Sequence, residues 1–406
     1  FSSEYNLGRL DMYCLMCSML SVLLMVYGKA EWLAVPLSAI GVMFHQGHVF
    51  MYMGMVLAMQ LYKALDAVKG QEDLRVIFSN KTSRKYLGMF LATMLTVSAL
   101  FIWFEGFSHI DGEKFADQLI DTACSMGPDA DYHIEVVDHE ILGVDLSAKE
   151  WEYHKQNFVE FPLYCLFMLP YILIALGFAR ELLGLAKTKI DKVKYIIVLA
   201  GVLTILPDMI LKVDYGRWIF SIISYYAVVL LALLAMRDTA VTEVSRQTVD
   251  RLRSKYPYAV LLLIYPLLFQ PLMHISICPL TERIVNILNM HLHMDSVAIK
   301  IGNAGEKRKM KEKLVKANYN IRQFIMMLAF VDLATFVTNY RGWVRSYNTT
   351  MLALSYEYGF TSRSLLGTIY HILDAVIPVD MMQYQNALVF ANVVTVLFIV
   401  FLLFFS

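Results

Sequence analysis

The chain has 406 residues, of which 58% are hydrophobic and only 17% are charged, and its 35 Lys and Arg residues balance 35 Asp and Glu residues. Soluble domains carry about 25% charged residues, so this composition excludes an ordinary soluble globule. Zero net charge also argues against a nucleic-acid partner, because binding to phosphate backbones depends on clustered Lys and Arg. The sequence predicts an all-α, polytopic membrane protein that forms one integral membrane domain over 1–406, with membrane lipids among its partners.

Apolar runs of about 17 to 25 residues, long enough to cross a bilayer, predict about nine or ten transmembrane helices. In chain order the expected spans are 10–28, 46–64, 86–104, 159–179, 195–213, 218–236, 257–275, 321–338 and 387–406. The apolar stretch 30–45 contains Pro36 and ends at His45-Gln46-Gly47-His48. We therefore expect a half-helix or an interfacial helix there, leading into the next span.

Lys and Arg residues concentrate in three loops, 63–85, 180–194 and 237–255. Cytoplasmic loops of membrane proteins are enriched in these residues, so we expect all three to be cytoplasmic. Segment 105–158 would then lie outside, and its thirteen Asp and Glu residues against three Lys predict an external acidic loop. Segment 338–386 is predicted to be a second external loop, rich in Arg and aromatic residues.

The basic run 307–313 conflicts with this topology, because counting the spans places it outside. Segment 276–306 contains no run long enough for a crossing, whereas the apolar end of the chain would continue into its beginning as a span followed by a cytoplasmic turn. We hypothesise a circularly permuted, fused or joined order in which 307–406 comes first. Residues 276–318 would be the seam or linker.

A helix is predicted from Thr361 onward in the second external loop. Its polar residues share one face, and they are Arg363, Gly367, Tyr370, His371 and Asp374. Such a helix would lie in the outer interface or dip into the protein, with the polar stripe toward a cavity. The alternative is an interfacial helix that only anchors the loop.

A short external turn carries Asp214 and Arg217, spaced i, i+3 at a helix start. They could form a capping ion pair next to Trp218 in the interfacial aromatic belt. In the other interpretation, Arg217 holds an anionic head group with two parallel hydrogen bonds, which guanidinium geometry favours.

Further polar residues lie at the expected span ends. His45 and His48 are three residues apart, and without a nearby carboxylate this spacing favours buried hydrogen-bonding or acid/base groups over zinc ligands. Glu105 ends a span and is either a general base or simply the first solvated residue of the acidic loop. The sequence contains no nucleotide-binding or metal-binding motif, so we expect no cofactor and no metal.

Three motifs carry a resemblance to a known family. They are Phe44-His45-Gln46-Gly47-His48, Asp214-Tyr215-Gly216-Arg217-Trp218, and Tyr356-Glu357-Tyr358-Gly359-Phe360 followed by Arg363. With the rotated order of spans and loops, the chain resembles the Wzy-like and EpsG-like polysaccharide polymerases, which are membrane glycosyltransferases of the GT-C class. The resemblance implies an enzyme that joins oligosaccharide units carried on polyprenyl diphosphate, at the outer face of a bacterial inner membrane.

The residue types suit this chemistry. A leaving diphosphate develops negative charge, which fixed guanidinium groups stabilise without a metal; the external candidates are Arg217, Arg341, Arg345 and Arg363. The acceptor hydroxyl needs a base within hydrogen-bond reach, and the candidates are His371 and His45, followed by Asp214 and Glu105, with His48 as a further residue of the cavity wall. Aromatic side chains would stack on sugar rings, and the candidates are Trp343, Tyr358 and Tyr370.

Two other classes of function stay open. A transporter or flippase of lipid-linked sugars predicts a polar path that reaches both faces near mid-membrane. A non-catalytic membrane assembly protein predicts neither such a path nor a shared cavity, with the acidic loop as its contact surface. An enzyme predicts that external Arg and His residues converge on one cavity.

Overall fold

The computed structural model describes residues 10–108, 110–126, 134, 136–137, 160–211, 215–254 and 346–405. All of these belong to one compact unit. The expected spans 257–275 and 321–338 and the proposed seam 276–318 lie outside the described residues.

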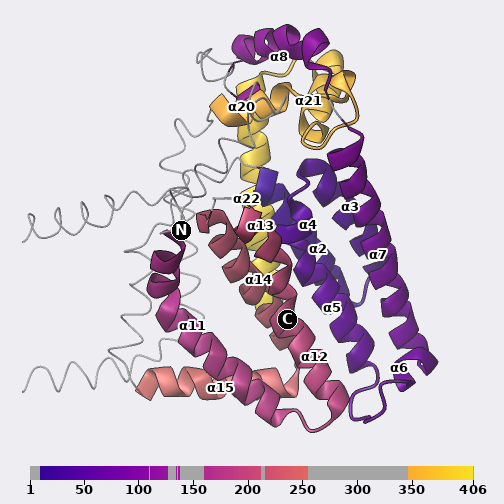
Figure 1. The fold of residues 1–406 in the computed structure, drawn as a ribbon, viewed down its shortest axis with the longest axis vertical. Helices are drawn as coiled ribbons and strands as arrows, with labels where there is room; N and C mark the ends of the chain where they lie inside the picture. The colour runs from indigo at the N-terminus through magenta and orange to yellow at the C-terminus, as the bar shows by residue number, and fades with distance from the viewer. Residues whose placement is uncertain are drawn as a thin grey trace, which may run out of the picture. The chain divides into compact units, whose positions relative to one another are not determined.

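The described residues form helices and contain no strand (Figure 1), which confirms the all-α fold. Five helices are long and apolar enough to cross a membrane. They are α2 (Leu10–Tyr27), α7 (Lys81–Gly106), α11 (Glu160–Leu185), α14 (Tyr215–Ala235) and α22 (Met381–Phe405). Their length and composition are consistent with a polytopic membrane protein.

The expected span 46–64 is broken in two. The 3-10 helix η1 (Glu31–Leu33) and α3 (Ala34–Phe44) form the expected half-helix, and α4 (His48–Met51) is then separated from α5 (Met53–Asp66) by Tyr52. Helix α3 stops because the extended backbone of His45 lets its ring Nδ1 accept a hydrogen bond from the Gly47 N–H, 2.8 Å away. With 11 and 14 residues, α3 and α5 rise about 17 and 21 Å, less than a bilayer core.

The expected span 195–213 is also divided, into α12 (Lys189–Ala200), η3 (Gly201–Ile205) and α13 (Leu206–Leu211). Gly54 of α5 packs against this break, where an added methyl group would overlap the Gly201 carbonyl oxygen. The Thr204 hydroxyl donates to the Phe50 carbonyl over 3.0 Å. The two broken segments are thus packed against each other within the bundle.

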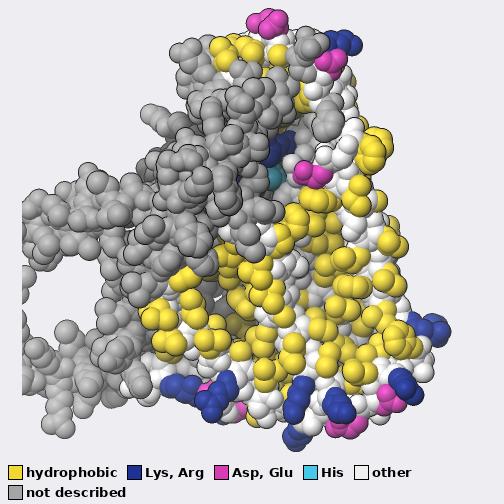
Figure 2. Space-filling view, in the orientation of Figure 1, with side chains coloured by type: hydrophobic (Ala, Val, Ile, Leu, Met, Phe, Trp, Pro, Cys, Tyr) yellow, Lys and Arg dark blue, Asp and Glu magenta, His cyan; other side chains and the backbone are white. Residues whose placement is uncertain are grey.

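The two ends of the bundle differ in chemistry. The end that we call the basic end contains α6 (Val76–Ser79), the start of α12 and the amphipathic helix α15 (Thr239–Ser254). Figure 2 shows a broad hydrophobic surface with Lys and Arg side chains along its edge at this end. This distribution agrees with the cytoplasmic side expected from the loop charges.

The opposite end, called the capped end, carries α8 (Gly112–Met126), α20 (Ser346–Ala353), η4 (Tyr356–Tyr358) and α21 (Leu365–Val376) (Figure 1). The cap has its own core, formed by Leu119, Val136, Val137, Met351, Leu354 and Tyr358. Part of the acidic segment 105–158 is therefore a helix, α8, packed on α20 of segment 338–386. Gly367 lets α21 approach the Leu354 carbonyl so closely that no side chain would fit.

Helices α2 and α22 lie side by side and run in the same direction. Tyr13 lies near Tyr384 at their beginnings, and the Tyr27 hydroxyl at the end of α2 donates to the Leu402 carbonyl near the end of α22, over 3.4 Å. The end of α22 therefore lies beside the end of α2, about 27 Å along the helix from the start of α2.

Candidate functional site

A polar contact between distant parts of the chain forms at the capped end. The turn after α3 meets the loop before α21: the Arg363 N–H donates to the Met43 carbonyl over 3.0 Å, and the Ser362 hydroxyl donates to the Gln46 side-chain oxygen. The Arg363 guanidinium Nη2 lies 3.3 Å from His45 Nε2. Two residues from different predicted motifs, 318 positions apart, are thus brought together.

The backbone of Arg363 has φ +73°, in the left-handed region that residues with a Cβ rarely adopt. Its fixed conformation depends on neighbours on both sides, including the contact with Met43 and a hydrogen bond between the Thr361 and Ser364 hydroxyl groups. Strain of this kind, about 1–3 kcal/mol, persists where the surroundings over-determine the conformation and is frequent at ligand sites. The backbone of Arg363 is therefore held in place by the loop, and the guanidinium contacts His45.

His48 lies behind this contact and is completely buried. Its ring packs directly over Gly41 of α3, where any side chain would collide with it. Neither ring nitrogen has a hydrogen-bond partner among the described side chains and backbone. Buried polar groups are nearly always partnered, so an imidazole in this state is available to a water or ligand that reaches it.

A second guanidinium is fixed on the other side of the same turn. Arg217 Nε and Nη2 donate to the two carboxylate oxygens of Asp11, both over 2.8 Å, and the guanidinium lies 5.3 Å from the Trp218 ring centroid. The hydroxyl of the buried Tyr52 lies near Asp11, Arg217 and Ser221. Arg217 thus forms an ion pair, but with Asp11 of α2; Asp214 lies outside the described residues.

Figure 2 shows a basic and a histidine side chain below the cap, with an acidic side chain beside them, above the hydrophobic surface of the bundle. Arg363 contacts His45 in the turn 45–52, and α4 of this turn packs against α2 and α14, the helices that carry Asp11 and Arg217. We call these residues, with His45, His48 and Tyr52, the capped-end site.

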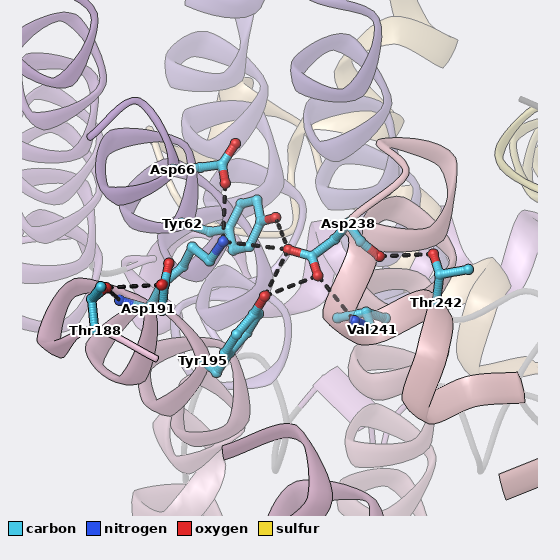
Figure 3. Close-up of polar contacts among 9 residues, drawn as sticks. Tyr62, Asp66, Thr188, Asp191, Tyr195, Asp238, Val241 and Thr242 are labelled. Atoms are coloured by element: carbon cyan, nitrogen blue, oxygen red, sulfur yellow. Dashed lines mark hydrogen bonds and ion pairs between the residues drawn. The ribbon is translucent and has the colours of Figure 1, made fainter. Parts of the chain in front are cut away.

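A second buried polar cluster occupies the basic end (Figure 3). Lys194 Nζ lies 3.0 Å from an Asp66 carboxylate oxygen and 3.3 Å from one of Asp238, and it stands over the rings of Tyr62 and Tyr195 at 4.9 and 4.8 Å. The Tyr62 hydroxyl donates to Asp238 over 2.6 Å, and the Tyr195 hydroxyl over 2.9 Å. This basic-end cluster joins α5, α12 and the corner between α14 and α15.

Asp238 also caps α15, because its carboxylate accepts the Val241 N–H over 2.9 Å. Burial alone would raise the pKa of this carboxyl, but the hydrogen bond from Tyr62, the Val241 N–H, the charge of Lys194 and the hydrogen bond from Tyr195 lower the pKa below its ordinary value. The carboxylate stays ionised, with every side-chain contact satisfied. We interpret the basic-end cluster as a structural ion-pair network.

The remaining predicted residues are placed as follows. Glu105 is exposed at the end of α7, and Tyr358 is buried in the core of the cap, its ring 5.4 Å from that of Phe115. Tyr370 is buried, donating to the Val379 carbonyl over 3.2 Å. His371 is half-buried, its ring 5.4 Å from that of Tyr370. Arg341, Trp343 and Arg345 lie outside the described residues, as Asp214 does.

The predicted helix of the second external loop begins later than expected, at Leu365, so Arg363 precedes it. The face packed on the protein contains Leu366, Gly367 and Tyr370, whereas Ile372 and Val376 are exposed. Within the part of the chain that the structure describes, no group of three or more His, Cys, Asp or Glu residues could hold a metal ion.

The described residues define a helical fold with five candidate membrane spans and a guanidinium–imidazole contact at one end of the bundle. Comparison with known proteins gives no further identification, because no family model, no curated protein and no solved structure matches the chain.

Sequence reasoning missed Asp11 and the whole basic-end cluster. Asp11 is an acidic residue in the first turn of an apolar helix, and a charge at that position was a usable signal for a buried partner. Lys194 and Asp238 lie in segments of the sequence that are rich in charged residues, and the sequence alone does not distinguish one buried pair from its exposed neighbours.

Proposed function

We propose that the protein is a glycosyltransferase of the bacterial inner membrane that joins oligosaccharide units carried on polyprenyl diphosphate, and that the capped-end site is its active site. The single observation that carries the proposal is the contact between Arg363 and His45. A donor for a leaving phosphate and a candidate base stand next to each other at the end of the bundle expected to face outward.

The chemistry assigns a role to each of these groups. Arg363 donates hydrogen bonds to the diphosphate as its bond to the sugar breaks, where a preorganised donor is worth about 100- to 1,000-fold in rate. The acceptor hydroxyl oxygen bonds to the anomeric carbon as the bond to the diphosphate breaks, and its proton passes to the His45 ring. Because His45 Nδ1 accepts the Gly47 N–H in the structure, this step requires the ring to release that hydrogen bond.

The interior of the bundle favours an enzyme over a transporter. Polar groups lie at both ends of α5. Tyr52 directly precedes its first residue, and Gln60, Lys63 and Asp66 lie toward its other end. Between them lies the apolar run 53–59, whose Gly54 is in close contact with Gly201 and whose Met55, Val56 and Met59 are fully buried. Within the described residues, this dense apolar layer separates the capped-end site from the basic-end cluster.

The test is reconstitution of the purified protein in liposomes with the lipid-diphosphate oligosaccharide of its own pathway, followed by separation of products by size. We expect a ladder of longer lipid-linked chains that is absent with Arg363→Ala. A matched control is Arg84→Ala, because Arg84 is exposed at the basic end. Unchanged substrate that has moved to the other leaflet would identify a transporter instead.

A further inference from the structure

We propose that Asp11 is a positioning residue, which orients Arg217 toward the diphosphate of the substrate. This inference rests on the proposed function and adds a residue to its site. Asp11 and Arg217 are 206 positions apart, and the paired side chains are only 9% and 15% exposed. Their two parallel hydrogen bonds of 2.8 Å fix both the position and the plane of the guanidinium.

The geometry explains why a carboxylate is needed at this position. Arg217 lies at the beginning of α14, where a long side chain carries about 2 kcal/mol of rotamer entropy. Asp11, in the first turn of α2, accepts hydrogen bonds from the Nε edge of the guanidinium, and the Trp218 ring lies beside the guanidinium. The Arg217 side chain is already ordered before the substrate binds, so the entropy cost of ordering it does not reduce the free energy of binding or raise the barrier of the reaction.

The pair is also connected to the rest of the capped-end site. Helix α4 packs against both α2, which carries Asp11, and α14, which carries Arg217, and Tyr52, at the end of α4, is four residues after His48. The Cys14 thiol, one helical turn after Asp11, donates to the Gly41 carbonyl over 3.3 Å, and Gly41 supports the His48 ring. Asp11 therefore fixes Arg217 relative to the turn that carries His45.

A purely structural ion pair would explain the same contacts, and an exchange of the two charges separates the explanations. In the double variant Asp11→Arg with Arg217→Asp, the buried ion pair is restored but the guanidinium is on α2 instead of α14. A structural role requires only the pair, whereas a positioning role requires the guanidinium on α14.

The experiment compares Asp11→Asn, Arg217→Lys and the exchanged double variant in the liposome polymerisation assay, with thermal stability in detergent measured on the same samples. We expect Asp11→Asn and Arg217→Lys to lower kcat about 10- to 100-fold with little change in KM, because the loss falls in the transition state. The exchanged variant should recover the stability lost in Asp11→Asn without recovering kcat. If Asp11→Asn does not accumulate, Asp11→Glu replaces it, with the same expected loss of kcat.

Recovery of kcat together with stability in the exchanged variant would overturn the assignment, as would wild-type kcat in Asp11→Asn. Both results leave the proposed function intact, because the wild-type protein makes polymer in either case. Absence of polymer from the wild-type protein would instead overturn the proposed function and, with it, the role of Asp11.

Discussion

At the scale of single residues, Arg363 combines a strained backbone with a side chain of the proposed active site. Substitution by glycine separates the effect of the backbone on stability from the effect of the side chain on activity. Arg363→Gly removes the Cβ that disfavours φ +73° and should leave thermal stability unchanged or raise it by about 1 kcal/mol. The same change removes the guanidinium and should lower polymerisation at least about 100-fold. Thermal unfolding and the liposome assay on one sample measure both effects.

Two variants check this interpretation of Arg363. Arg363→Lys keeps the charge but not the planar fork, and it should recover only a small part of the activity. A glycine variant that polymerises normally would show that the guanidinium has no part in the reaction. A glycine variant that is strongly destabilised would show that the contacts of the side chain stabilise the protein by more than the backbone strain costs.

Lys194 provides a residue-scale prediction about stability. It is the cation between Asp66 and Asp238, and its side chain is 3% exposed. Lys194→Met leaves two carboxylates without their cation and should destabilise the protein by about 3–5 kcal/mol, because breaking a buried pair leaves an uncompensated charge. Chemical unfolding in detergent measures the loss. Lys192→Met, at an exposed position of the same helix, should change stability by less than about 0.5 kcal/mol.

At the scale of secondary-structure elements, Asp238 links the start of α15 to the bundle, and its titration makes this link depend on pH. Its pKa is lowered in the folded protein, whereas an unfolded Asp titrates near about 3.9. The stabilisation is complete above this ordinary value and is lost as pH falls through the lowered pKa. The difference in thermal midpoint between wild type and Asp238→Asn should therefore be constant near neutral pH and shrink below about pH 4.

A matched carboxylate tests the origin of this dependence. Asp250 lies on the same helix and is exposed, with only a 3.5 Å contact to Arg246, so Asp250→Asn should have little effect at any pH. An equal pH dependence in both variants would assign the effect to the overall charge of α15 rather than to the cap.

The packing of α5 against η3 predicts a contrast between two glycines. Gly54→Ala places a methyl group onto the Gly201 carbonyl oxygen and should destabilise the protein by about 1–3 kcal/mol. Gly88 lies in α7 with nothing within 4 Å of an added Cβ, so Gly88→Ala should stabilise by about 0.5–1 kcal/mol through helix propensity. Unfolding midpoints in a denaturing detergent measure both, and equal effects would contradict the close packing.

Particular elements show what the sequence could predict. The spans of α2, α7 and α14 were predicted to within a few residues, because their apolar runs are uninterrupted. The continuous span 46–64 was wrong, because the helix is interrupted at Tyr52, between α4 and α5, and hydropathy does not record such a local break in the backbone. The pairing of Arg217 with Asp11 depends on how α2 and α14 pack, which no local spacing encodes.

At the scale of the whole molecule, the capped-end site can act on an external substrate only if the capped end faces outward. The Lys and Arg residues at the basic end favour the cytoplasmic side for that end. The exposed residues Gln118 of α8 and Lys192 of α12 mark the two ends. To obtain one reactive cysteine at either of these two positions, Cys124, Cys165 and Cys278 are replaced and the buried Cys14 and Cys17 are kept. A single cysteine is then introduced at position 118 or at position 192.

A membrane-impermeant maleimide should label Gln118→Cys in intact bacterial cells and Lys192→Cys only after the membrane is permeabilised. The reason is the cost of moving Lys and Arg across the bilayer, about 2.5–3.5 kcal/mol for each residue at its centre, which favours the orientation with the basic loops inside. The reverse labelling pattern would place His45 and Arg363 on the cytoplasmic side. Lipid-linked oligosaccharides at the outer face would then be out of their reach, and the proposed reaction would have to be abandoned even if the site geometry were correct.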